Sequence, residues 1–482
     1  MPATTKFRLF CGQDSDGMIR KLEDATINKR AVSSLEIRET ALEDDVIDSI
    51  VNLLSKGSVT TIHLEDCSAH LNHSVVRLVE ALGNCRDVRL SESTFLSKFF
   101  LETFLESAKQ LQNLRIRDHL LVDQVEALSR GLASNKMLHT LDLSRSRIDD
   151  FSVLAEGLRG GCAKRLKLRS IGLRDQHLVT LVNALESSSS SSSRSSVLES
   201  LDLSFNRLRN LGCLGDFLRH PDCHLKELLV GYQNLWQPSR SGTKNIDVSG
   251  IAAALTESGG CGSGTGLTTL QLPRNELDDS DALLLAEAVR SGRSALEVLD
   301  LRENDISDTG AVALAESARS SPGLRQLHLR GNPSGTRASR ALLGAVSTNF
   351  RLVAVVHGDN GRGEEDDDRI HREIRYHTAL NRGGRRLLLL GNNDRDPSSS
   401  SSSPGPPPLA LWPLVLEKQA SRREGEWIHE KQQTTADHRC AEGLRIDVLY
   451  YLLRYNPAIF GSSSPSPMPR RRNPSGTGRN SS

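Results

Sequence analysis

The sequence has few aromatic residues and no long apolar run. Phe, Trp and Tyr make up 4% of the 482 residues, so large rings cannot dominate the core. No run of about 18 apolar residues occurs, which argues against a membrane-spanning helix. The first residues lack the apolar segment of a secretory signal. A cytoplasmic protein is expected, and the short run Arg470-Arg471-Arg472 leaves a nuclear location open.

Catalytic and metal-binding patterns are also missing. The eight cysteines are scattered without a CxxC pair, which favours buried or incidental thiols in a reducing compartment over disulfides or metal ligands. GxSxG, HExxH, P-loop and supported GxGxxG patterns are absent. The formal net charge of +1 gives no general attraction to nucleic acid or membrane. We therefore predict no enzyme, no cofactor and no metal site.

What the sequence does contain is one short pattern, repeated. Leu299 to Asp308 reads LDLRENDISD, an instance of LxLxxNxL. We take the first apolar residue of each copy as an anchor, and ten of the twelve steps between anchors span 25 to 29 residues. The anchors are Phe7, Leu35, Ile62, Val88, Leu114, Leu141, Leu166, Leu201, Leu228, Leu270, Leu299, Leu327 and Val355.

Each repeat changes its period along its length. Apolar residues alternate at the start, as in Leu299 and Leu301, which predicts a short strand with one buried face. The spacing then becomes helical, as in Leu283, Ala286 and Val289. Stacked units of this kind predict an α/β solenoid.

Two polar positions recur at fixed distances from the anchor. Five residues after it stand Cys67, Asn206, Asn275, Asn304, Asn332 and Asn360, which could hydrogen-bond the backbone of neighbouring turns. Nine residues after it stand Asp16, Asp44, Asp123, Asp150, Asp175, Asn210, Asp279 and Asp308, with Ser97 and Thr336 as weaker matches. We predict that the second set caps helix N-termini, since single aspartates kept one turn apart do not make a metal site.

From these residues the chain resembles the ribonuclease-inhibitor class of leucine-rich repeat proteins, most clearly over 267–332. The resemblance implies a horseshoe with parallel strands on the concave face and helices on the convex face, and it says little about function. The segments around Tyr376, Trp412 and Tyr450 resemble a tail found on uncharacterised algal repeat proteins. That tail is expected to cap the solenoid or to dock a second partner, such as a ligase subunit.

Composition and periodicity divide the chain into six predicted parts. They are an N-terminal capping repeat (1–30), the repeat domain (31–360, with insertions near 187–196 and 236–266), a C-terminal cap helix (361–395), a Ser/Pro linker (396–408), a helical tail (409–460) and a disordered end (461–482). No nucleotide-binding module precedes the repeats, so a free-standing repeat domain with a tail is expected.

Function is expected on the concave face, where side chains beside the buried pair point. The middle turns are basic there, which suggests an acidic protein partner. The alternative is an ordinary solvated strand face. The predicted partner-binding residues are Arg89, Arg115, Arg117, Asp142, Arg165, Lys167, Arg169, Asp202, Asp300, Arg302, His328 and Arg330.

We predict a non-catalytic, monomeric scaffold or adaptor that binds a protein of unknown identity. The alternative is a regulator of an enzyme, either as a small-GTPase activator or as a substrate adaptor of a ubiquitin ligase. RNA is a weaker possibility, because the concave positions beside the buried pair contain no aromatic residue on which a base could stack.

Overall fold

The computed structural model describes residues 5–9, 17, 19–20, 32–57, 59–70, 73–159, 163–186, 198–233, 246–257, 266–358 and 365–382. The chain divides into two units, residues 1–374 and 375–482. Of the second unit, the described part is 375–382, the C-terminal end of helix α13 (Glu365–Arg382). The repeats lie in the first unit.

The described strands of the repeats form one parallel sheet, in which spatial order follows chain order. A separate two-stranded sheet pairs β6 (His119–Leu120) with β8 (Arg147–Ile148). The strands of the main sheet are β1 (Thr5–Leu9), β2 (Val32–Ala41), β3 (Thr61–Ser68), β4 (Asp87–Ser91), β5 (Asn113–Arg117), β7 (Thr140–Asp142), β9 (Arg165–Lys167), β10 (Ser200–Asp202), β11 (Glu227–Leu229), β12 (Thr269–Gln271), β13 (Val298–Asp300), β14 (Gln326–His328) and β15 (Ala354–Val356).

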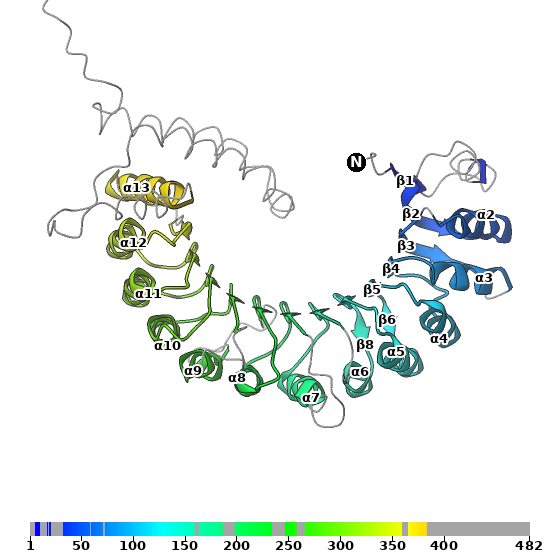
Figure 1. Cartoon of the computed structure of the whole chain (residues 1–482), viewed down its shortest axis with the longest axis horizontal. Helices are drawn as coiled ribbons and strands as arrows, with labels where there is room; N and C mark the ends of the chain where they lie inside the picture. The colour runs from blue at the N-terminus through cyan, green and yellow to red at the C-terminus, as the bar shows by residue number, and fades with distance from the viewer. Residues whose placement is uncertain are drawn as a thin grey trace, which may run out of the picture. The chain divides into compact units, whose positions relative to one another are not determined.

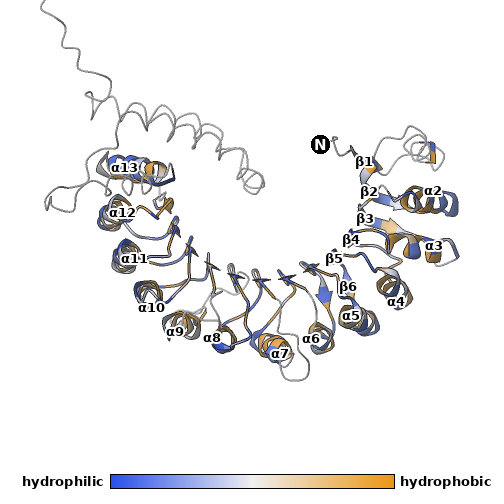
Figure 2. Ribbon diagram, in the orientation of Figure 1, coloured by the Kyte–Doolittle hydropathy of each residue, from blue (hydrophilic) through white to orange (hydrophobic). Residues whose placement is uncertain are grey.

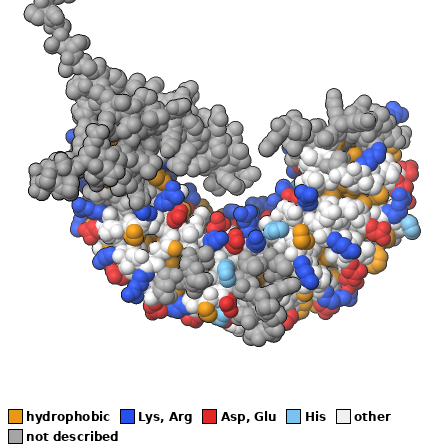
Figure 3. Space-filling model, in the orientation of Figure 1, with side chains coloured by type: hydrophobic (Ala, Val, Ile, Leu, Met, Phe, Trp, Pro, Cys, Tyr) orange, Lys and Arg blue, Asp and Glu red, His pale blue; other side chains and the backbone are white. Residues whose placement is uncertain are grey.

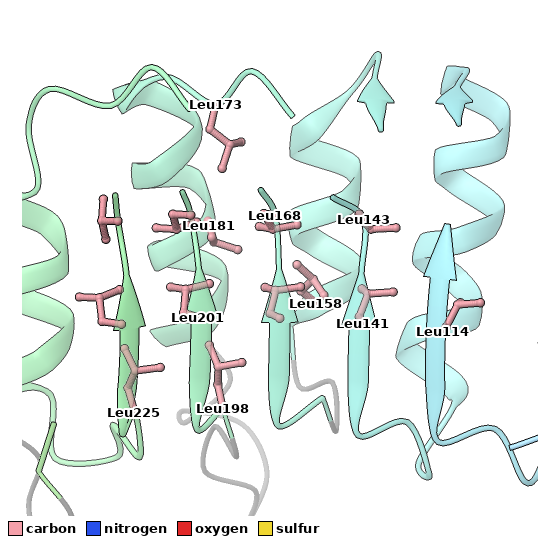
Figure 4. Packing of buried hydrophobic residues seen from close by; sticks show 14 of the residues in the cluster. Leu114, Leu141, Leu143, Leu158, Leu168, Leu173, Leu181, Leu198, Leu201 and Leu225 are labelled. Atoms are coloured by element: carbon pink, nitrogen blue, oxygen red, sulfur yellow. The ribbon is translucent and has the colours of Figure 1, made fainter. Parts of the chain in front are cut away.

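The register of this sheet confirms the anchors. Leu201 pairs with Leu166 on one side and Leu228 on the other, and Leu299 pairs with Leu327. Figure 4 shows the leucines of successive strands lying level with one another. Even the divergent first copy fits, because Phe7 of β1 pairs with Leu35 of β2.

A helix follows most strands and lies on the outer side of the sheet (Figure 1). Strands repeat about every 4.8 Å, whereas packed helices need about 8–10 Å, so the first unit curves with its sheet on the inside. The helices are α2 (Asp44–Ser55), α3 (His73–Leu82), α4 (Lys98–Ser107), α5 (Val122–Ser134), α6 (Phe151–Leu158), α7 (Asp175–Glu186), α8 (Gly212–Arg219), α9 (Ser249–Glu257), α10 (Asp279–Arg290), α11 (Asp308–Ser320) and α12 (Thr336–Thr348).

The hydrophobic core lies between the sheet and the helices. The ribbons change between apolar and polar residues within each helix (Figure 2), as expected for elements with one buried face. Leu299 and Leu301 are fully buried, as predicted. Of the residues that showed the helical spacing, Ala286 and Val289 are buried in α10, whereas Leu283 is 47% exposed.

The polar position five residues after the anchor hydrogen-bonds neighbouring turns, as predicted. The Nδ2 group of Asn304 donates to the carbonyls of Leu272 and Leu301, each at 3.0 Å. Its Oδ1 accepts from the N–H groups of Asn275 at 2.7 Å and Leu277 at 3.2 Å. One buried side chain thus satisfies four backbone groups where strands end.

The same position contains a residue that the pattern missed. Gln233 follows β11, and its Nε2 donates to the carbonyl of Leu203 at 2.9 Å while its Oε1 accepts from the N–H of Leu208 at 3.2 Å. The longer side chain replaces asparagine without loss of the bonds. Cys67 is also inward, with its Sγ 3.6 Å from the carbonyl oxygen of Ile37.

The aspartates nine residues after the anchor act in two ways. Asp150 is the N-cap of α6 and accepts from the N–H groups of Ser152 and Val153, as predicted. Asp308 does not cap its own helix. Its Oδ1 accepts from the N–H groups of Gly335 at 2.8 Å and Ala338 at 3.0 Å, which begin the helix of the next turn.

Asp279 makes the same cross-turn cap one repeat earlier. Its Oδ1 accepts from the N–H groups of Ser307 at 2.8 Å and Gly310 at 3.0 Å, at the start of α11. A Cβ on Gly310 would lie 2.7 Å from this oxygen, so the cap depends on glycine there. The prediction of capping was correct in chemistry for these aspartates and wrong about which helix receives the cap.

Several sequence predictions fall wholly or partly outside the described residues. Asp16, Asn360, the insertion near 187–196, the linker, the helical tail and the C-terminal end lie outside them. The second predicted insertion, 236–266, contains helix α9 (Ser249–Glu257) within its described part. The predicted helix in the 361–395 segment corresponds to α13, whose Ile370 and Ile374 are buried in the hydrophobic core.

Substitution of Asn304 by alanine tests the role of the buried amides. The change removes four hydrogen bonds to buried backbone groups and should lower the free energy of unfolding by about 3 kcal/mol in urea titrations. Asp305→Ala, at the exposed neighbouring position, should change it by less than about 0.5 kcal/mol. Equal effects of the two substitutions would contradict the assigned role.

Candidate functional site

The constant register turns each sequence position into a row of side chains across the concave face. The residues one before, one after and three after the anchor all point away from the helices, so every turn contributes up to three side chains to this face. The predicted partner-binding residues all lie on these strands or directly beside them. Their ionic pairing differs along the sheet.

In the N-terminal turns the charges neutralise one another. Glu36 is 3% exposed and accepts hydrogen bonds from the Nε groups of Arg8 at 3.0 Å and Arg38 at 2.8 Å. Arg38 also lies 3.0 Å from a carboxylate oxygen of Glu65. Two arginines and two glutamates thus form a closed network that leaves little net charge for a partner.

His63 lies beside this network, with its Nδ1 3.6 Å from Glu36 and its Nε2 3.8 Å from Glu65. Burial lowers the pKa of His63 below its ordinary value of 6.5, and the carboxylates of Glu65 and Glu36 only partly oppose this effect. The imidazole is therefore neutral at pH 7 and adds no positive charge to the face.

The C-terminal turns also contain a paired cation. Asp300 is 3% exposed, and Arg302 donates to both of its carboxylate oxygens, from Nε at 2.9 Å and from Nη2 at 2.7 Å. This hydrogen bond is the main cause that raises the pKa of Arg302, to which Tyr232 also contributes. Farther along, His328 contacts Gln326 at 3.3 Å, and Arg330 is exposed.

Three of the six predicted basic residues of the middle turns are paired with acids. Arg89 donates to both carboxylate oxygens of Asp87 at 3.2 Å, and Arg115 lies 3.6 Å from Asp142. Arg117 lies 3.5 Å from Glu92. The basic patch is therefore narrower than the sequence suggested.

Arg165, Lys167 and Arg169 differ from these three. All three are exposed, and none forms an ion pair with an acid in the part of the chain that the structure describes. They lie on and just after a single strand, β9, with side chains on the same face. Figure 3 shows Lys and Arg side chains gathered at the inner edge of the middle turns. We call Arg165, Lys167 and Arg169 the β9 cations.

Two predicted acidic residues flank the β9 cations. Asp142 and Asp202 each pair in register with Lys167, one from either neighbouring strand. Each carboxylate accepts the N–H two residues later, from Ser144 and Ser204 at 3.0 Å. These bonds hold the aspartates against their own strands, and neither forms an ion pair with Lys167 within 4.0 Å.

An aromatic pair that the sequence did not predict lies beside the β9 cations. Phe205 and Tyr232 follow β10 and β11 and stack with ring centroids 4.4 Å apart and planes 8° from parallel. The guanidinium carbon of Arg169 lies 4.2 Å from the centroid of Phe205. The expectation that this face lacks aromatic residues was therefore too broad, because the rings stand four residues after the anchor, outside the two positions considered in each turn.

That position imposes a left-handed backbone. Phe205 has φ 62° and Tyr232 has φ 60°, and the corresponding residue is also at positive φ in most other described turns. Among these residues, Gly331 alone meets the requirement without a steric cost. Bulky aromatic residues in this region cost of order 1 kcal/mol or more each, so the fold tolerates the two rings here rather than favouring them.

The described part of the chain places no reactive thiol on this face. The described cysteines are free, and Cys67 and Cys85 are buried. Burial raises the pKa of Cys67 to about 11 and that of Cys85 to about 12, so both are neutral thiols at pH 7. Among the described residues no group of three His, Cys, Asp or Glu side chains could hold a metal ion, and no helix is long and apolar enough to cross a membrane.

The repeats, the register and the parallel sheet define an α/β leucine-rich repeat solenoid. A leucine-rich repeat family model matches residues 194–215 and 295–315. No curated protein sequence matches the chain. The two matched stretches lie within repeats of the solenoid, in agreement with its leucine-rich repeat fold.

Similar solved structures share 14–15% sequence identity with the chain. One is an internalin from Listeria monocytogenes, covering 72% of this chain and 89% of its own, with a TM-score of 0.40. Another is a leucine-rich repeat protein from Leptospira interrogans, covering 64% and 80%, with a TM-score of 0.37. A third is the yeast complex of Rad7 and Elc1, covering 76% and 79%, with a TM-score of 0.41.

The pKa of His63 provides a test of the N-terminal network. Burial keeps this pKa below 6.5 in the folded state, so the unfolded chain takes up the proton more readily, and stability from His63 is present above pH 6.5 and falls as the pH drops through the folded pKa. Glu65→Gln removes the largest opposing charge and should lower the pKa further in an NMR titration of the imidazole.

The control for this titration is Glu39→Gln, which changes an exposed carboxylate that is not among the main causes of the lowered pKa of His63. It should leave the titration curve of His63 unchanged. A wild-type pKa above 6.5, or an unchanged pKa in Glu65→Gln, would show that the network is not arranged as described.

Proposed function

We propose that this protein is a non-catalytic scaffold of the ribonuclease-inhibitor-like class that binds an acidic protein partner through the concave face of its middle turns. The observation that carries the proposal is the difference in pairing between the β9 cations and the other predicted basic residues. Arg89, Arg115 and Arg117 each have an acid within 4.0 Å. The β9 cations have none among the described residues.

An unpaired cation on a rigid sheet favours association more than a paired one does. A paired arginine must exchange one carboxylate for another when a partner binds, so its net contribution is small. An unpaired guanidinium or ammonium gains a partner without that exchange and also attracts an acidic surface from a distance. The β9 cations therefore mark the part of the face where an acidic partner gains most.

The segments at the two ends of the repeat domain are assigned to caps that cover its core. We assign residues 1–30 to an N-terminal capping repeat and 361–395 to a C-terminal cap, because the exposed ends of a stacked core need cover. Burial of Ile370 and Ile374 supports the second assignment. Free thiols at Cys67 and Cys85 suit a reducing compartment, so we place the protein in the cytoplasm or nucleus.

Site-specific photo-crosslinking in the cells that express the protein tests the proposal. A benzoylphenylalanine at Lys167 should crosslink a partner, whereas the same group at Val179 on α7, a site that is 45% exposed, should not. Changing Arg165 and Arg169 to Glu in the protein that carries the crosslinker at Lys167 should reduce capture at least tenfold, because two attractive charges become repulsive.

The matched control reverses Arg130 and Arg159, which lie on or at the end of α5 and α6 and pair with Glu102 and Glu156. This double change alters the net charge by the same amount on the helix side, so capture should stay within twofold. Equal capture from Lys167 and Val179, or undiminished capture after reversal of Arg165 and Arg169, would refute the concave-face proposal.

A further inference from the structure

Both faces of the Phe205 ring are covered. Arg169, from the preceding turn, lies over the ring at 4.2 Å, and Tyr232, from the following turn, stacks at 4.4 Å. The turns on either side of Phe205 approach it from opposite directions along the sheet. A nucleic-acid base would need an open ring face, so this pair is poorly suited to take one.

The stack instead restrains Arg169. An exposed arginine usually samples many rotamers, and ordering its side chain opposes binding. The guanidinium carbon lies 4.2 Å over the ring centroid, and an arginine in such a contact can still donate from its N–H groups, because the ring accepts no conventional hydrogen bond from them. The edge of a guanidinium matches the two oxygens of a carboxylate.

The surface beside Arg169 carries only short side chains in the row of residues three after the anchor. The residues three after the anchor in the next three turns are Ser204, Gly231 and Pro273, none of which has a long side chain. A Cβ on Gly231 would lie 2.6 Å from a ring carbon of Pro273, so the position has no room for a larger residue. The next residue in this row is Arg302, four strands from Arg169, or roughly 19 Å.

The two ends of this row differ in ion pairing. Arg302 is bound to both carboxylate oxygens of Asp300, whereas Arg169 has no acid partner among the described residues. Lys167, two residues before Arg169, lies on the same side of β9 and also lacks one. A carboxylate that reaches this row therefore finds its strongest unpaired partner at the Arg169 end.

We propose that Arg169, held on the face of Phe205, binds a carboxylate of an extended acidic segment of the protein partner, with Phe205 and Tyr232 as positioning residues. This inference rests on the proposed function and specifies its anchor. Asp142 and Asp202, which flank Lys167 on the neighbouring strands, disfavour a continuous phosphate backbone across the strands, so a peptide with spaced carboxylates fits better than RNA.

Fluorescence anisotropy with a labelled ten-residue peptide of alternating serine and glutamate tests the proposal on the full chain. The wild-type protein should bind this peptide at low salt and should not bind the glutamine counterpart. Arg169→Gln should weaken binding about tenfold. Arg115→Gln removes the same charge from a residue already paired with Asp142 and should weaken it less than twofold.

Variants of Phe205 separate positioning from charge. Phe205→Leu keeps an apolar side chain but removes the ring, and should weaken peptide binding about fivefold with all charges intact. Phe205→Tyr keeps the ring and should restore binding to within twofold. Phe99→Ala removes a ring on α4 that is 55% exposed and should have no effect.

An NMR signal reports the restraint without any ligand. The side-chain Nε–H resonance of Arg169 should be shifted upfield by the ring current in the wild type and in Phe205→Tyr, and should return toward the ordinary position in Phe205→Leu. Thermal unfolding of each variant, followed by circular dichroism, should match that of the wild type. A shift unchanged in Phe205→Leu would overturn the positioning role.

Other outcomes would overturn the inference directly. These are no binding of the serine–glutamate peptide, equal losses in Arg169→Gln and Arg115→Gln, or unchanged binding in Phe205→Leu. Tighter binding of a ten-residue oligouridine that is lost in Arg169→Gln would assign the site to RNA instead. If crosslinking from Lys167 still requires Arg165 and Arg169 while Phe205→Leu has no effect, the proposed function stands and this inference fails.

Discussion

The constraint on which the rest of the structure depends is the alignment of the anchors between neighbouring parallel strands, which is kept even beside the register shift at Thr5 and Lys6. Anchor residues lie opposite anchor residues from β1 to β15, across turns of unequal length. Each position counted from the anchor therefore becomes a continuous row. The leucine rows build the core, the amide row closes the strand ends, and the outward rows form a surface on which charge pairing varies from turn to turn.

The fold could be predicted from the sequence because its signals are local and repeated. Alternating leucines such as Leu299 and Leu301 identify the strands without knowledge of distant contacts. Side chains that reach across turns were harder to place. Asp279 has the composition of an ordinary cap, and only three-dimensional proximity shows that it serves α11. Gln233 was not predicted because the sequence pattern contains asparagine at this position. Glutamine is one methylene longer, but its side-chain amide makes the same kind of hydrogen bond.

The candidate site was predictable in location and unpredictable in detail. Sequence spacing placed Arg115 and Arg169 on the same face, but it could not show that Arg115 contacts Asp142 while Arg169 contacts a ring. Ion pairs depend on side-chain reach between strands that are far apart in the chain. The stacked rings depend on the left-handed residue after each strand, a feature that brings Phe205 and Tyr232 beside the concave face although neither stands at a strand position.

The carboxylates of Asp279 and Asp308 link neighbouring turns of the solenoid in one direction only. Each one caps the helix that follows it, so these bonds run forward along the chain. Loss of one of these acceptors therefore leaves N–H groups at the start of the following helix without that partner, so a defect in one of these turns is passed to its C-terminal neighbour.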